Sequence, residues 1–91
     1  MVKIRFSSAL SNVTHSRETI LEVGNTTVKA VFDKLVQQFG PEFDKRIMDK
    51  GEIRRFVNVY VNGEDIRHLS GLDSPVNDSD EISILPAVSG G

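Results

Sequence analysis

The stretch RFVNVYVNGEDI, residues 55–66, decides the fold. Between residues 55 and 61 three valines alternate with aromatic or amide side chains, and this period of two predicts a β-strand with one buried face. Asn62-Gly63 follows directly. Both residues tolerate the positive φ of a type I′ turn, so the strand is predicted to turn back as a hairpin, with a short returning strand at 64–67.

Weaker strand signals lie on either side of this hairpin. Residues 2–7 alternate apolar and polar side chains, residues 18–23 read ETILEV, and residues 81–85 read EISIL. We predict a strand for each of these three runs. The polar, aperiodic residues 8–17 are expected to be a connecting loop.

One amphipathic helix is predicted before the hairpin, because six apolar residues recur at helical spacing and form a single stripe. They are Val28, Val31, Phe32, Leu35, Val36 and Phe39. Residues 25–27 (Asn-Thr-Thr) offer candidate N-caps, and Gly40-Pro41 is a typical stop. Residues 42–54 are expected to be a charged connection. Three apolar side chains can pin it to the body: Phe43, Ile47 and Met48.

The predicted order is ββαββ with a last strand near the C-terminus. One main helix packed on one face of a mixed sheet is an α+β arrangement in two layers. A chain of 91 residues has room for one modest core. We expect residues 1–86 to form the domain and residues 87–91 to form a flexible C-terminal tail ending in Gly-Gly.

Composition excludes several classes of function. The chain has no cysteine, which rules out a thiol nucleophile and cysteine-ligated metals. His15 and His68 stand alone in the sequence and are expected to be surface residues, so no metal site is predicted. No glycine-rich phosphate loop is present. The isolated protein is therefore expected to bind neither metal nor nucleotide and to catalyse no reaction.

The charge of the chain is unevenly distributed. Residues 68–91 carry four acids and no Lys or Arg, which predicts a partner surface that is basic around the tail. Basic residues at 45–55 are interleaved with acids, so nucleic acid is not an expected partner. The sequence shows neither a signal peptide nor a membrane span. We therefore expect no membrane association and a cytoplasmic location.

Residues 56–66, FVNVYVNGEDI, and residues 80–91, DEISILPAVSGG, resemble the ThiS/MoaD family of ubiquitin-like sulfur carriers. The resemblance lies in the strand–Asn-Gly–strand unit and in an ending made of a strand, a proline and Gly-Gly. It implies the β-grasp fold of ubiquitin. In that family an E1-like enzyme uses ATP to adenylate the terminal glycine. A sulfur donor then converts the adenylate to a thiocarboxylate, which a further enzyme consumes.

This resemblance makes Gly91 the reactive residue, the site of adenylate and thiocarboxylate. Gly90, Ser89 and Val88 form the tail that enters the partner, and glycines suit a narrow channel because they lack Cβ. Pro86 has no N–H and is expected to end the strand ladder, so that the chain leaves the sheet. The carrier would be a non-catalytic co-substrate, and ATP would be supplied on the activating partner.

The leading hypothesis is the small subunit of molybdopterin synthase, which donates sulfur to a large synthase subunit in molybdenum cofactor biosynthesis. One alternative is a sulfur carrier for cysteine or thiamine biosynthesis that serves another acceptor enzyme. A second is a ubiquitin-like modifier joined to target lysines through Gly91. A third is an adaptor that uses only its folded surface.

Partners are expected to dock on the sheet face opposite the helix. The valines of residues 57–61 suit the helix-covered face, so Phe56 and Tyr60 should point away from it. Leu85 shares that open face if the last strand is a neighbour. Together with Pro86 these residues would form an apolar partner-binding patch. The alternative is that residues 42–54 fold over this face and cover it.

Overall fold

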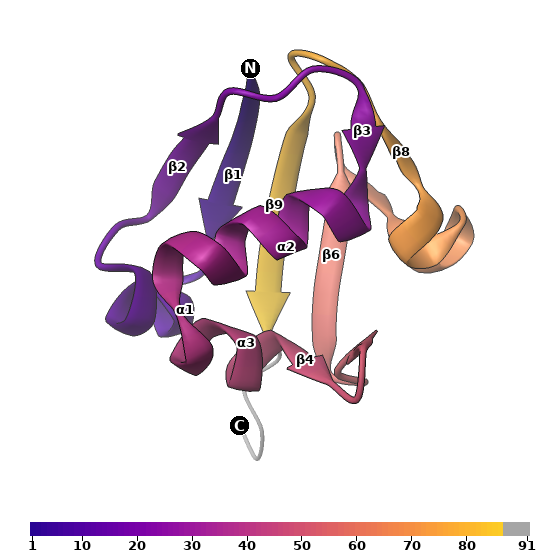
Figure 1. The fold of residues 1–91 in the computed structure, drawn as a ribbon. Coiled ribbons are helices and arrows are strands. Elements are labelled where there is room, and N and C mark those ends of the chain that lie inside the picture. Colours follow the sequence, from indigo (N-terminus) through magenta and orange to yellow (C-terminus); the bar gives the residue numbers. More distant parts are fainter. Residues whose placement is uncertain (87–91) are drawn as a thin grey trace.

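The computed structural model describes residues 1–86 and is built on one five-stranded sheet (Figure 1). The strands lie in the order β2-β1-β9-β6-β7. Their bounds are β1 Val2–Phe6, β2 Glu18–Leu21, β6 Val57–Val61, β7 Glu64–Asp65 and β9 Glu81–Pro86. β1 is antiparallel to β2 and parallel to β9, and β6 is antiparallel to both of its neighbours. The sheet is therefore mixed, as predicted.

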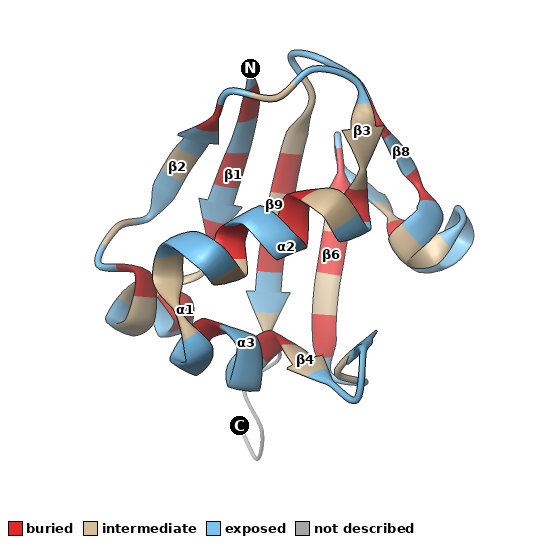
Figure 2. Cartoon of the chain, in the orientation of Figure 1, coloured by how far each residue is buried: buried red, intermediate tan, exposed pale blue. Residues whose placement is uncertain are grey.

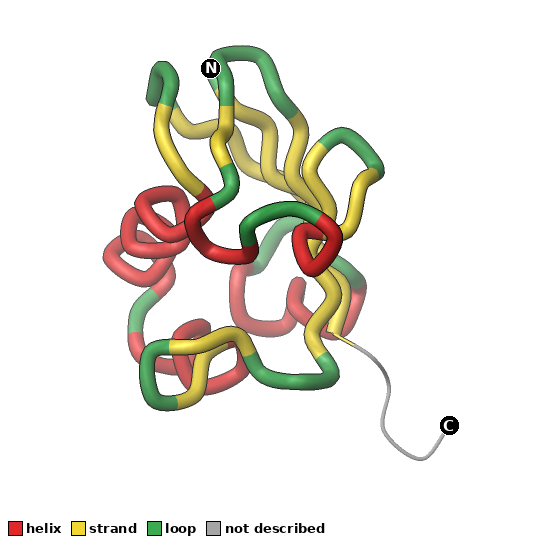
Figure 3. Tube along the Cα trace, turned by 90° about the vertical axis from the view of Figure 1, so that its right-hand side faces the viewer, coloured by secondary structure: helices red, strands yellow, loops and turns green. Residues whose placement is uncertain are grey.

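The main helix lies against one face of this sheet (Figures 1 and 3). The helices are α1 Ser8–Thr14, α2 Val28–Phe39 and α3 Pro41–Ile47. Short elements complete the fold. They are the strand pair β3 Thr26–Thr27 and β8 Pro75–Val76, the hairpin β4 Met48–Asp49 and β5 Glu52–Ile53, and the 3₁₀ turns η1 Ile66–His68 and η2 Gly71–Asp73. This two-layer arrangement confirms the predicted α+β class.

α2 begins and ends where its sequence predicts. The Oγ1 of Thr27 accepts a hydrogen bond from the amide of Ala30 at 3.3 Å, which caps the first turn. Gly40, with φ of +86°, ends the helix. Its stripe is buried at four of the six predicted positions, Val28, Val31, Phe32 and Leu35, while the last two, Val36 and Phe39, are partly buried against the core.

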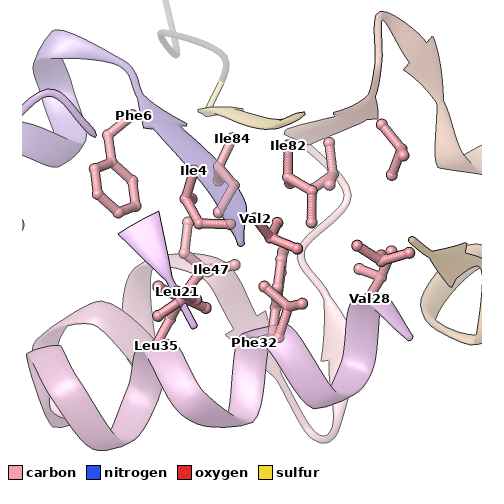
Figure 4. Close-up of a cluster of buried hydrophobic side chains, with 14 of the residues drawn as sticks. Val2, Ile4, Phe6, Leu21, Val28, Phe32, Leu35, Ile47, Ile82 and Ile84 are labelled. Carbon is pink, nitrogen blue, oxygen red and sulfur yellow. The ribbon is translucent and has the colours of Figure 1, made fainter. Parts of the chain in front are cut away.

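The core lies between α2 and the inner face of the sheet (Figure 4). Along β1, β6 and β9 every second residue points inward, so burial alternates along each strand (Figure 2). Six of these inward residues are at most 1% exposed: Val2, Ile4, Val57, Val59, Ile82 and Ile84. Each buried aliphatic side chain contributes about 1.5–3 kcal/mol to folding.

The loop predicted for residues 8–17 is wrong, because α1 occupies Ser8–Thr14. The Oγ of Ser7 caps this helix by accepting from the amide of Leu10 at 3.3 Å. Only Leu10 and Thr14 are buried. Two buried positions in seven residues form no visible stripe, so tertiary packing rather than local pattern stabilises this helix.

The charged connection predicted for residues 42–54 is also more ordered than expected. Pro41 opens α3 at a position where a proline is favoured, and the β4–β5 hairpin follows. Phe43 and Ile47 are fully buried and Met48 packs against the core, so the predicted pinning is confirmed. The Phe43 ring lies within 6.1 Å of those of Phe6 and Phe39, measured between centroids.

Other boundaries differ from prediction by one or two residues. β2 ends at Leu21, β6 begins at Val57, and the returning strand β7 gives way to η1 after Asp65. The hairpin turn is as expected, since Asn62 and Gly63 both have positive φ, +52° and +84°. Both centres of a type I′ turn require this.

Candidate functional site

The two faces of β6 are arranged as predicted. Its three valines face the core, while Tyr60 is only partly buried and Phe56, just before the strand, is 50% exposed. β9 is the neighbour of β6, and its register places Leu85 opposite Asn58 and Ser83 opposite Tyr60. Residues opposite one another in a sheet share a face. Leu85 therefore lies on the same open face as Tyr60, and it is 39% exposed.

We call Phe56, Tyr60, Leu85 and Pro86 the tail-root patch. The register places Tyr60 and Leu85 on the open face, whereas Pro86 lies opposite the core-facing Val57 and so belongs to the other face, at the end of the strand. The expectation that Pro86 shares the open face is therefore corrected. Pro86 is the last residue that the structure describes, and it lies opposite Val57, the residue that follows Phe56. The trace of β9 runs toward this end of the molecule (Figure 1). The apolar patch thus borders the point from which residues 87–91 continue.

Pro86 is the last residue of β9, so the strand extends one residue beyond the predicted run of 81–85. Backbone polar groups alternate sides along a strand. The carbonyl of Ile84 accepts from the amide of Ser7, on the β1 side, at 3.2 Å; the nitrogen of Pro86 faces that same side. β1 has already ended at Phe6. The missing N–H therefore costs the sheet no hydrogen bond.

Residues 42–54 border the tail-root patch but leave Phe56 and Leu85 exposed. Phe43 and Ile47 anchor this segment in the core cluster, together with residues of α2. Phe56 and Leu85 remain among the exposed large apolar residues. Phe56 and Leu85 are therefore exposed within the described part of the chain. This agrees with the expectation of an exposed apolar surface and not with the alternative that residues 42–54 cover these two side chains.

A surface pocket of about 340 Å³ adjoins the patch. It is lined by Ala9, Leu10, Lys45, Arg46, Arg54, Phe56 and Pro86. We call it the basic pocket, because its three charged side chains are all cations. In the sequence these cations are interleaved with acids. The pattern therefore does not indicate that the fold places the cations, and none of the acids, in the lining of the pocket.

Three of the four acids of the C-terminal third, Asp78, Asp80 and Glu81, lie at or just before the start of β9, at the other end of the molecule. Asp78 pairs with the N-terminal ammonium of Met1, and that hydrogen bond, followed by the charge of the ammonium, lowers the pKa of the Asp78 carboxyl. Glu81 opens β9 and lies 3.8 Å from Arg5. Since Pro86 closes the same strand, the acids do not surround the tail root. The position of these acids gives no support for a basic partner surface at the tail, which stays a prediction.

The remaining predicted site residues lie outside the described part of the chain. They are Val88, Ser89, Gly90 and Gly91, together with the rest of the predicted tail.

His15 and His68 are exposed, as predicted. Residues 1–86 gather no group of three metal-binding side chains. No helix within this range has the length and apolar character needed to cross a membrane.

Comparisons with known proteins agree with this fold and with the sequence resemblance. The model of the ThiS family matches residues 4–91. The sulfur carrier protein CysO of Mycobacterium bovis is 34% identical over 93 residues, which covers 99% of this chain and 98% of that protein. A chain of the Amycolatopsis orientalis BexX/CysO complex superimposes with a TM-score of 0.88 at 32% identity, and both chains are covered completely.

A further structure belongs to a protein named as a modifier. The small archaeal modifier protein 1 of Methanosarcina acetivorans superimposes with a TM-score of 0.83 at 34% identity, covering 99% of this chain and 95% of that one. These similarities confirm the ubiquitin-like β-grasp fold.

Proposed function

This chain belongs to the ThiS family, and from that premise we propose that it is a sulfur carrier whose Gly91 carboxylate becomes a thiocarboxylate. The observation that carries the proposal is the family match, which extends to residue 91 and so includes Gly90-Gly91. Its full-length similarity to a protein named a sulfur carrier supports it.

The chemistry requires activation by a partner. A carboxylate is a poor electrophile, so an oxygen of the Gly91 carboxylate attacks the α-phosphorus of ATP held by an E1-like enzyme, and pyrophosphate leaves. A hydrosulfide ion from a sulfur donor then attacks the carbonyl carbon of the acyl adenylate, AMP leaves, and loss of the sulfur-bound proton gives the thiocarboxylate. The carrier contributes only its narrow C-terminal tail, which must enter the active site of the partner. It is a co-substrate of these reactions and not an enzyme.

The described domain suits this task. β9 ends beside the exposed Phe56 and Leu85, so the partner that receives the last residues also meets an apolar surface. Five residues follow Pro86, and five residues can span at most about 17 Å. A partner that binds Gly91 at its reactive centre must therefore bring its own surface close to the tail-root patch.

We propose cysteine biosynthesis as the destination of the sulfur. The similar carriers bear the name CysO, which favours the cysteine alternative over the molybdopterin synthase hypothesis. The partner that accepts the sulfur would then be an enzyme of cysteine formation instead of a large molybdopterin synthase subunit.

Protein modification is a second candidate. Its support is the similarity to small archaeal modifier protein 1. Both candidates share the adenylation step and differ in what attacks the activated carbonyl: a sulfur nucleophile or the amine of a target lysine.

Adenylation by the organism's own E1-like enzyme tests the shared step. ATP–pyrophosphate exchange should depend on the intact protein and disappear when Gly91 is deleted. The thermal midpoint should stay unchanged in this variant, because residue 91 lies beyond β9. As a matched control, Ser89→Ala should be activated normally, since both side chains are small. Normal exchange by the Gly91-deleted variant would contradict the proposal.

A further inference from the structure

We propose that the basic pocket is a docking site for an acidic segment of the E1-like activating enzyme. The proposal rests on the proposed function, because it concerns how that enzyme recognises the tail-bearing end of the domain. The pocket is lined by two kinds of residue. We call its apolar residues, Ala9, Leu10, Phe56 and Pro86, the floor, and its cations, Lys45, Arg46 and Arg54, the rim.

The rim brings together residues from two segments. Lys45 and Arg46 are exposed residues of the last turn of α3. Arg54 follows β5, and its Nε donates to the carbonyl oxygen of Lys45 at 2.7 Å. This bond holds the guanidinium of Arg54 at the C-terminal end of α3. The three positive charges therefore share one rim because of the fold.

These cations have no acidic partner within the described domain. Among residues 1–86, no ion pair engages Lys45, Arg46 or Arg54. Gathering like charges is unfavourable unless an anion approaches. A carboxylate fits best here, because the planar guanidinium can bind both of its oxygens at once.

The apolar floor indicates that the anion belongs to a protein. Phe56 is half exposed, and a free phosphate would leave its ring in water. A peptide segment that carries carboxylates next to an apolar side chain would satisfy the rim and bury the floor. Buried apolar anchors surrounded by charge are typical of protein interfaces.

The position of the pocket points to the activating enzyme. Pro86 is part of the pocket and precedes residues 87–91. An enzyme that adenylates Gly91 must take up those residues and so meet the surface around Pro86. β9 has six residues from Glu81 to Pro86, which separates the acidic and basic ends by about 17 Å. This polarity would orient the carrier on its partner.

Charge reversal tests the docking site. The double variant Lys45→Glu/Arg46→Glu should raise the KM for the carrier in ATP–pyrophosphate exchange at least tenfold and leave kcat unchanged. Lys34→Glu serves as the control, because Lys34 is an exposed cation of α2 outside the pocket. The KM of the wild type should rise with ionic strength, and that of the double variant should change much less.

Direct binding to the enzyme without ATP separates this inference from the proposed function. The double variant should bind at least tenfold more weakly than the wild type and the Lys34→Glu protein, whether or not adenylate forms. Equal binding by all three proteins would overturn the docking site even if Gly91 is activated. Amide NMR gives a second test, in which the chemical-shift changes at residues 45, 46 and 54 are compared after addition of inorganic phosphate and after addition of the enzyme. Larger changes with phosphate would also overturn the docking site and would indicate that the pocket binds a free anion.

Discussion

The guanidinium of Arg67 donates a hydrogen bond to the carbonyl oxygen of Val57 at 2.8 Å. Its Nη2 also reaches the carbonyl of Arg55 at 2.7 Å, and its Nη1 reaches Oδ1 of Asn58 at 2.8 Å. β7 pairs only with residues 60 and 61 of β6. Arg67 therefore satisfies backbone acceptors at the start of β6 that β7 leaves unpaired, on either side of the exposed Phe56 in the sequence.

Replacing Arg67 with alanine should destabilise the protein by about 1–3 kcal/mol, because charge-assisted hydrogen bonds to backbone acceptors are lost. Arg67→Lys should not restore stability, since an ammonium cannot donate in a planar fork. Urea denaturation measures both effects. The control is Arg17→Ala, at an exposed arginine on the chain before β2. If the Arg67→Ala protein is as stable as this control, the hydrogen bonds of Arg67 to the edge of β6 do not contribute to stability.

Phe43→Ala should lower the free energy of unfolding by about 3–5 kcal/mol, because a fully buried aromatic ring is removed from the core. This prediction tests whether residues 42–54 are part of the folded domain. The neighbouring exposed residue provides the control: Glu42→Ala should change stability by about 0.5 kcal/mol or less. Equal stabilities in calorimetry would mean that α3 contributes little to the core.

Phe56→Asp and Leu85→Asp should leave the fold intact and weaken binding to the activating enzyme. Each apolar side chain buried in the complex would contribute on the order of 1.5–3 kcal/mol. Amide NMR checks the fold, and calorimetry measures the affinity.

Two controls sharpen this test. Val59→Asp places a charge on the buried face of the same strand and should unfold the protein. Ile20→Asp changes another exposed apolar residue, on β2, which β1 separates from β9, and should bind normally. Normal binding by both Phe56→Asp and Leu85→Asp would place the docking surface elsewhere.

The sequence predicts the parts of the fold that have a regular pattern. The stripe of α2 and the alternation in β6 assign the core face and the open face correctly, because each repeats over several residues. α1 and α3 each have seven residues and two buried positions. Helices of this length depend on tertiary contacts, so local pattern could not reveal them.

The basic pocket could not be predicted for a similar reason. Lys45 and Arg54 are nine residues apart in sequence and meet only because the β4–β5 hairpin returns the chain beside α3. The amide of Arg54 donates to the carbonyl of Ile47 at 2.9 Å, which fixes this return. Composition likewise does not show at which end of β9 the acids at 78–81 lie, so their distance from the tail could not be predicted from the charge pattern.

The intact mass of the protein isolated from its native cells tests the central claim most directly. If the chain carries sulfur, a fraction of the protein should be heavier by the difference between one sulfur and one oxygen atom, and fragmentation should place that change at Gly91. The heavier species should disappear when the gene for the E1-like enzyme is deleted. An unmodified mass throughout, with Gly91 found only in isopeptide bonds to lysines of other proteins, would contradict the sulfur-carrier account and favour protein modification.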